Sequence, residues 1–476
     1  MGAVPQGGSP VQTAERMPPA VQALLDEPPY HPFILTSVGL AVAAGFMLAT
    51  LVPLSMALDW GWGGRYSPLV QAHGQAQLLG WAGLFIMGMA FRLMPRFSGR
   101  PLRFPALIWL SWASLTTALV LRLAGQPAGE GLGQRGALLA SGALGVVAAA
   151  AFGLIVVGTL AHRSSRAGAT GYFFLLGAVA FAAQAGLNLA LLIQMVERGG
   201  DTVRPLEASA LLHLQLYGFV AMFILGVASR AVPTFSGLPR PELQAKALAL
   251  LLAGAVVVFV VSALLAAGGA RAANLYRLQG AVFAMLGPLF LAGTWLVGIF
   301  RPAANRLRAA SQQHIWFIRS AFVWLTVAGG LAAYYGVRAG MAGSPISPYG
   351  LDALRHTVGV GFASVMVVGM AMLVVPEFAI RRMQHPSERG LPLLVLALLN
   401  AAAALRVGAA VATPHWLSPD RYWPMAAAGV LAEVALLLFL ALFLQSWRQK
   451  RSIVESQVPL RSDALASLGE RRAGAR

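Results

Sequence analysis

The sequence has no cysteine and very few charged residues. Of its 476 residues, 11% are charged and 58% are hydrophobic. A soluble globular domain carries about 25% charged residues, so this composition excludes a soluble fold and indicates a polytopic membrane protein. Without cysteine, the chain cannot form structural disulfides, Cys-ligated clusters or a thioether-attached haem. Any redox centre must therefore use other ligands.

Acidic residues are scarce as well. The chain has 17 Asp and Glu against 35 Lys and Arg, for a formal net charge of +18. In a soluble protein this excess would suggest nucleic acid, but here the basic residues cluster in short segments between apolar runs. Such a pattern reports membrane topology. We therefore expect membrane lipid around the chain and no nucleic-acid partner.

Twelve apolar runs are long enough to cross a bilayer, which needs about 20 apolar residues per helix. The sequence predicts an all-α fold with spans near residues 32–57, 68–94, 104–124, 136–161, 169–196, 206–233, 244–268, 272–300, 314–339, 350–376, 391–412 and 422–447. Basic residues follow the even-numbered spans, as Arg96 and Arg100 follow the second. By the positive-inside rule, these loops and both termini are cytoplasmic in a bacterial-type inner membrane.

The chain divides into three predicted segments. Residues 1–30 are rich in Pro and Gly and lack the basic start and cleavage site of a signal peptide, so we expect a disordered cytoplasmic tail. Residues 31–447 form the twelve-helix membrane domain. Residues 448–476 form a basic cytoplasmic tail.

One pattern occurs three times in the membrane domain. Residues 71–99 align without a gap with residues 209–237, and a weaker copy occupies residues 352–378. The copies fall in the second, sixth and tenth spans, so the repeat unit is four helices, and three four-helix arcs around a pseudo-threefold axis are expected. Helix packing alone explains the glycines that the copies share. Each copy also opens with a histidine, and an imidazole inside a membrane needs a partner, which indicates function.

The three repeat histidines do not occupy equivalent positions. His213 and His356 align with each other, whereas His73 lies two residues earlier in its copy and aligns with Leu211 and Leu354. Two residues turn a helix by about 200°, so His73 faces the opposite side of its helix. His73 and His356 can then point into one pore from two helices, as a bis-imidazole haem requires. His213 points into a second pore, opposite Leu354, where it is a single candidate metal ligand.

Three further side chains are candidates for the surroundings of these histidines. Tyr217 follows His213 by four residues on the same helical face. A buried, hydrogen-bonded tyrosine is its simpler explanation. Gln77 and Gln215 align with each other and either hydrogen-bond across helices or orient an imidazole.

Twelve spans with histidines on the second, sixth and tenth resemble subunit I of the haem-copper oxidases and nitric oxide reductases. The segments HPFILTSVGLAVAAGF, GWAGLFIMGMAFRLMPRFSG and LRHTVGVGF more closely resemble NnrS, a haem- and copper-containing membrane family linked to nitric oxide. The resemblance implies a low-spin haem b held by His73 and His356, and a copper-ligand position at His213 followed by Tyr217. It also implies a redox partner or quinol, and a small diatomic gas such as nitric oxide as ligand.

The sequence departs from these families at the second metal. Span seven lacks the adjacent histidine pair of the oxidases, Leu354 occupies the second haem-ligand position, and QAHGQAQ replaces the Trp-His-x-His-Glu-Met pattern of NnrS. These departures argue against copper and against gas reduction at a haem-copper pair, and an oxidoreductase activity stays open. We expect a membrane b-type haem protein acting in nitric oxide response, electron transfer or diatomic-gas binding. The alternatives are a twelve-helix transporter without haem, with Glu433 as its main mid-span candidate, and a purely structural membrane partner.

Overall fold

The computed structural model describes residues 30–128, 131–162, 165–301, 313–375, 390–416 and 418–457. Within these ranges the regular structure is entirely helical, and twelve helical spans are long and apolar enough to cross a membrane, as the sequence predicts. The elements that build them are α2 (His31–Leu40), η1 (Ala41–Phe46), α3 (Met47–Ala57), α4 (Tyr66–Gln75), η3 (Ala76–Gly83), α5 (Leu84–Ser98), α6 (Leu107–Gly125), α7 (Leu132–Leu160), α8 (Ala169–Glu197), α9 (Pro205–His213), η5 (Leu214–Ala221), α10 (Met222–Ser236), α11 (Glu242–Ala267), α12 (Ala272–Val297), α13 (Gln313–Ala342), α14 (Pro348–His356), η7 (Thr357–Ser364), α15 (Val365–Val374), α17 (Gly390–Ala412) and α18 (Tyr422–Gln457).

The ends of the chain differ in part from the predicted segments. Helix α18 continues to Gln457, so the start of the segment predicted as a tail from residue 448 is helical. The predicted N-terminal tail, apart from Tyr30, and residues 458–476 lie outside the described residues.

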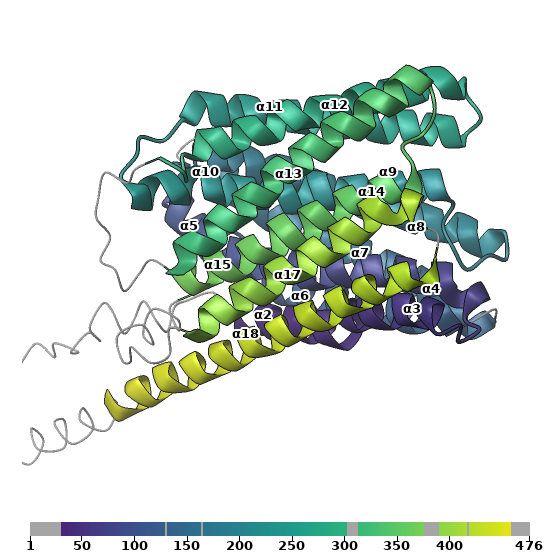
Figure 1. The fold of residues 1–476 in the computed structure, drawn as a ribbon. Helices are drawn as coiled ribbons and strands as arrows, with labels where there is room; N and C mark the ends of the chain where they lie inside the picture. The colour runs from purple at the N-terminus through teal and green to yellow at the C-terminus, as the bar shows by residue number, and fades with distance from the viewer. Residues whose placement is uncertain are drawn as a thin grey trace, which may run out of the picture.

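The three repeat helices form the centre of the bundle. In their most apolar windows 89%, 89% and 78% of the residues are buried, against at most 56% in any other span. Their middle segments η3, η5 and η7 contact one another in all three pairs. In Figure 1, α4, α9 and α14 lie toward one end of the bundle and α5, α10 and α15 toward the other. The repeat helices therefore run side by side in the same direction.

Polar contacts join each pair of repeat helices. Gln215 Nε2 donates to Gln75 Oε1 at 3.3 Å, the Trp81 indole donates to Ser364 Oγ at 3.0 Å, and Arg355 Nη2 donates to Ser209 Oγ at 3.2 Å. Hydrogen bonds between apolar helices fix their relative rotation, because an unpaired polar group would be costly there. These contacts set which faces of the repeat helices meet.

Each repeat helix changes from α-helical to π-helical turns at the same place. The π-helical segments η3, η5 and η7 are eight residues long and occupy identical positions in the repeat alignment. π-Helical turns are rare and are found frequently at functional sites. The sequence predicted uninterrupted spans here, because apolar periodicity does not distinguish the two helix types over so short a stretch.

Aligned glycines allow the repeat helices to approach the spans that precede them. A Cβ atom built on Gly88, Gly226 or Gly369 would lie 2.7 Å, 2.6 Å or 2.3 Å from the Cβ atom of Phe33, Phe173 or Phe317, respectively. Each phenylalanine belongs to the preceding span of the same four-helix unit. These shared glycines therefore serve packing, as small residues do at membrane-helix interfaces.

We expect Gly369→Ala to destabilise the protein by roughly 1 to 3 kcal/mol, the usual effect of overpacking a close contact. Gly408→Ala on α17 is the matched control, because no atom lies within 4 Å of a Cβ atom built there. Thermal unfolding of both variants in the same detergent measures the effect. Equal unfolding midpoints for the two variants would contradict the packing role.

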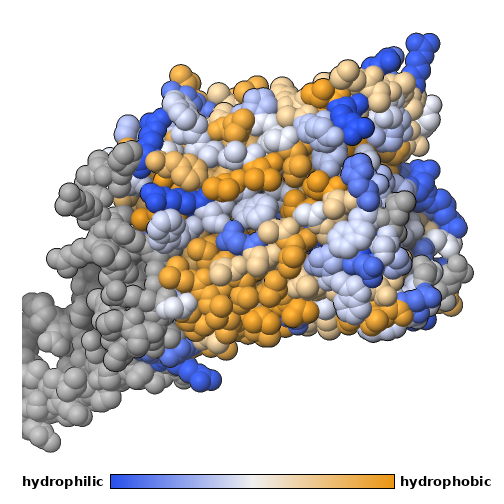
Figure 2. All heavy atoms as spheres, in the orientation of Figure 1, coloured by the Kyte–Doolittle hydropathy of each residue, from blue (hydrophilic) through white to orange (hydrophobic). Residues whose placement is uncertain are grey.

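The outer surface of the bundle is apolar. Large hydrophobic side chains are exposed on the outer helices, such as Val179 at 62%, Trp295 at 69% and Val337 at 51%. Figure 2 shows hydrophobic residues over much of the visible long side, with most of the strongly hydrophilic residues toward its two ends. Exposed apolar patches of this extent are typical of surfaces that contact lipid or partners. The twelve apolar helices are compatible with a multi-pass membrane protein.

Candidate functional site

The structure brings His73 and His356 together in one cavity. His73 lies on α4 and His356 is the last residue of α14. Their ring centroids are 6.4 Å apart, and their ring planes differ by 12°. The cavity encloses about 1040 Å³ of empty space, its open mouth included. The meeting of these two rings agrees with the two-residue offset in the repeat alignment.

Both imidazoles are held through the same ring nitrogen. His73 Nδ1 lies 2.8 Å from the carbonyl oxygen of Gly45, and His356 Nδ1 lies 2.9 Å from the carbonyl oxygen of Asp352. A carbonyl oxygen can only accept a hydrogen bond, so Nδ1 carries a proton in each ring, and in a neutral imidazole this leaves Nε2 as the nitrogen that can bind a metal. Metal-binding histidines are held in this way, because the bond fixes both the tautomer and the ring orientation.

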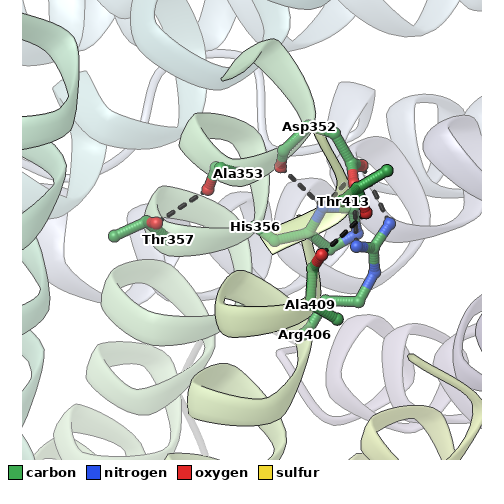
Figure 3. A network of polar contacts seen from close by, with 7 residues as sticks. All are labelled: Asp352, Ala353, His356, Thr357, Arg406, Ala409 and Thr413. Atoms are coloured by element: carbon green, nitrogen blue, oxygen red, sulfur yellow. Dashed lines mark hydrogen bonds and ion pairs between the residues drawn. The ribbon is translucent and has the colours of Figure 1, made fainter. Parts of the chain in front are cut away.

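An ion pair between Asp352 and Arg406 lies beside the Nδ1 atom of His356. Asp352 Oδ1 lies 3.1 Å from His356 Nδ1, and the same carboxylate is bound by both terminal nitrogens of Arg406, at 2.7 and 2.8 Å. Figure 3 shows Asp352 between the imidazole and the guanidinium, with Arg406 reaching it from α17. The carboxylate thus ties the last turn of α14 to a neighbouring span. Sequence reasoning missed this pair, although Asp352 stands four residues before His356, a spacing at which helical side chains meet.

The rest of the cavity wall is largely apolar and includes gaps left by glycines. The Trp81 indole lines the cavity beside Ser364, with which it is hydrogen-bonded. Gly74 and Gly359 belong to the same wall, and a Cβ atom built on Gly359 would meet no atom within 4 Å. An apolar chamber with a few well-placed polar groups is the usual form of a cofactor pocket.

His213 lies apart from this cavity, among aromatic rings. It is 4% exposed on α9, and its ring centroid lies 3.7 Å from that of Phe259 and 5.0 Å from that of Phe283. Its Nε2 has no hydrogen-bond partner among the described residues. Tyr217 packs beside it, with the ring centroids 4.5 Å apart. Within the described part of the chain, no group of three or more His, Asp or Glu side chains is placed to hold a metal ion.

The two predicted glutamines have different surroundings. Gln215 is fully buried, and its Nε2 donates to Gln184 on α8 as well as to Gln75. It takes the first of its two predicted roles, a hydrogen bond across helices. Gln77 lines the cavity of His73 and His356, next to Gly45, and its Nε2 has no partner among the described residues.

Comparison with known proteins gives one family match. Residues 304–448 match the model of a family described as a domain of unknown function (DUF8744). The matched residues contain the last four spans, and with them His356, Asp352 and Arg406, but not His73. No curated protein matches the chain. The match covers less than half of the chain, and the family description names no activity.

Proposed function

We propose that the chain is an integral-membrane b-type haem protein in which His73 and His356 are the two axial ligands. The pairing of these imidazoles from different helices carries the proposal. A metal ion binds an imidazole nitrogen at about 2 Å, so two imidazoles on opposite sides of one ion have their centres roughly 6 Å apart. The observed separation of 6.4 Å fits this arrangement, and so do the hydrogen bonds that leave both Nε2 atoms free.

The membrane arrangement is part of the same proposal. We infer that the twelve helices cross an inner membrane as three four-helix arcs, with both termini in the cytoplasm. The aligned π-helical segments, their mutual contacts and the glycine-phenylalanine contacts repeated in each unit support the arcs. The basic residues after the even-numbered spans support the orientation.

The protein's own residues would orient the cofactor. The Gly45 carbonyl and the Asp352 carboxylate hold the two rings, and Arg406 holds Asp352. Haem held by both His73 and His356 would supply one-electron chemistry. Two protein side chains that would both bind the metal favour electron transfer among the roles implied by the sequence. Such a role requires a redox partner at the membrane.

The transporter alternative has less support in the structure. Glu433, its main mid-span candidate, is partly buried on α18 and does not line the cavity of the two histidines. Carriers place their functional residues near the membrane midplane, commonly on broken helices. We therefore assign no transport role to Glu433.

Haem analysis of the purified protein tests the proposal directly. The chain is expressed with a haem precursor and purified in a mild detergent, and haem is measured by the pyridine haemochrome method together with iron and copper. We expect one haem b per chain, a low-spin spectrum and iron in equal amount. A monodisperse, thermally cooperative protein that is colourless, and that stays so after incubation with haemin, would overturn the proposal.

A further inference from the structure

A second cavity lies beside the one that holds the two histidines. It encloses about 1520 Å³ of empty space, its opening included, between the second, third, sixth, seventh, eighth and tenth spans. Its lining contains two arginines, Arg122 and Arg355, and no aspartate or glutamate. Arg355 and Gly74 border both cavities, whereas Arg122 lines only the second. In a cavity between helices of the proposed membrane domain, positive charge with no counter-charge in the wall indicates a binding site.

Arg122 is buried without an ionic partner. Its side chain on α6 is 3% exposed, and its Nε donates to Gln126 Oε1 at 2.7 Å. Its Nη1 has no hydrogen-bond partner, and no carboxylate lies within 4.0 Å of the guanidinium among the described residues. Gln126 gives the arginine a neutral acceptor and no negative charge, and its own Nε2 donates to Gln71 Oε1 at 2.9 Å. A buried cation in an apolar setting is strongly unfavourable unless an anion pairs with it.

Two further polar side chains of the cavity wall present hydrogen-bond donors. Gln279 on α12 is 6% exposed, lines the cavity, and has an Nε2 without a partner in the described part of the chain. Within the described residues, the guanidinium of Arg355 makes one hydrogen bond, to the Ser209 hydroxyl at 3.2 Å. Donors from three spans therefore face a cavity whose wall offers them neutral amide and hydroxyl oxygens but no carboxylate. The remaining wall is mostly apolar, as at Leu206, Leu211, Leu212, Phe283, Ile346 and Leu351.

We propose that this cavity binds a carboxylate carried on an apolar body, with the carboxylate among Arg122, Gln279 and Arg355. Guanidinium groups match carboxylates with two parallel hydrogen bonds, and a desolvated site strengthens such bonds. The apolar wall accommodates the rest of the molecule. Two sources can supply the carboxylate: a free apolar acid, or a propionate of a porphyrin bound in the cavity of His73 and His356. Arg122 and Gln279 lie outside the histidine cavity, which favours the free acid.

Equilibrium dialysis with radiolabelled octanoate tests this site in the full-length protein, with protein-free micelles as the background. We expect saturable binding that octan-1-ol, an uncharged molecule of equal length, does not displace. Arg122→Gln is expected to weaken binding at least tenfold, and Arg122→Lys to weaken it less. Arg277→Gln is the matched control, because Arg277 is exposed on the same helix as Gln279 and does not line the cavity.

Thermal unfolding shows whether each variant is folded. Gln279→Leu removes one donor without touching the arginine network, and it serves as the second test if Arg122→Gln does not fold; we expect it also to weaken binding. The proposal fails if octanoate does not saturate, if octan-1-ol competes equally, or if folded donor variants bind as wild type does.

A comparison of wild type with His73→Ala separates the two sources of carboxylate. A free acid binds with equal affinity in both proteins. Binding confined to a haem-free form would assign the cavity to porphyrin propionates and overturn the free acid. The octanoate assay needs no haem, so its result stands even if the purified protein proves to bind no haem.

Discussion

Replacement of His73 or His356 by alanine is expected to abolish the low-spin haem spectrum of the purified protein. Each imidazole would occupy one axial position, and the remaining one alone leaves the iron five-coordinate, so any residual haem becomes high-spin. Haem per chain is expected to fall several-fold in the single variants and to background in the double variant. Visible absorption and electron paramagnetic resonance of the ferric protein distinguish the two spin states.

Two other histidines provide the controls. His415→Ala changes an exposed residue away from the cavity, and His213→Ala changes the buried imidazole that packs on Phe259. Both proteins should keep the low-spin spectrum if His73 and His356 are the axial pair. A normal spectrum in His73→Ala or in His356→Ala would remove that residue as a ligand. Rescue of His73→Gly by added imidazole would show that the alanine effect is local.

The parts of the structure that depend on local pattern could be predicted from the sequence. The twelve spans follow from run length alone, and several begin within one or two residues of their predicted starts, as at His31, Ala169 and Ala272. The convergence of His73 and His356 follows from helical rotation and the repeat alignment. The alignment worked because the shared glycines fix the same contacts in each unit.

The parts that depend on tertiary contact could not be predicted in the same way. Arg406 is 54 residues from Asp352, and only the packing of α17 on α14 makes the pair. The three π-helical segments depend on a change in backbone hydrogen bonding that side-chain periodicity does not report. Arg122 carried no such signal, because it lies close to the end of the predicted span 104–124, where an arginine can reach the membrane surface. What it faces becomes visible only when the second, eighth and tenth spans meet.

Replacement of Asp352 is expected to have the second large effect, a loss of haem affinity. Asp352→Ala removes the carboxylate beside His356 Nδ1 and leaves Arg406 without its partner. Loss of such a supporting group typically lowers metal affinity 10- to 100-fold, and we expect a similar loss of haem affinity. Stability should also fall, by roughly 1 to 3 kcal/mol, less than for a fully buried pair. We expect this smaller loss of stability because the Asp352 side chain is 31% exposed and that of Arg406 is 19% exposed.

Three further variants separate support of the imidazole from simple stabilisation. Asp352→Asn keeps an acceptor for the imidazole but loses the ion pair, so haem affinity should fall less than in Asp352→Ala. Arg406→Gln leaves the carboxylate beside His356 and should mainly lower stability. Asp420→Ala, at an exposed carboxylate, is the control. Haem affinity from transfer to apomyoglobin and unfolding midpoints are measured on all four proteins. If Asp352→Ala lowers stability while haem affinity stays as in Asp420→Ala, the carboxylate serves the bundle alone, and the His356 ring is held in place by the Asp352 backbone carbonyl.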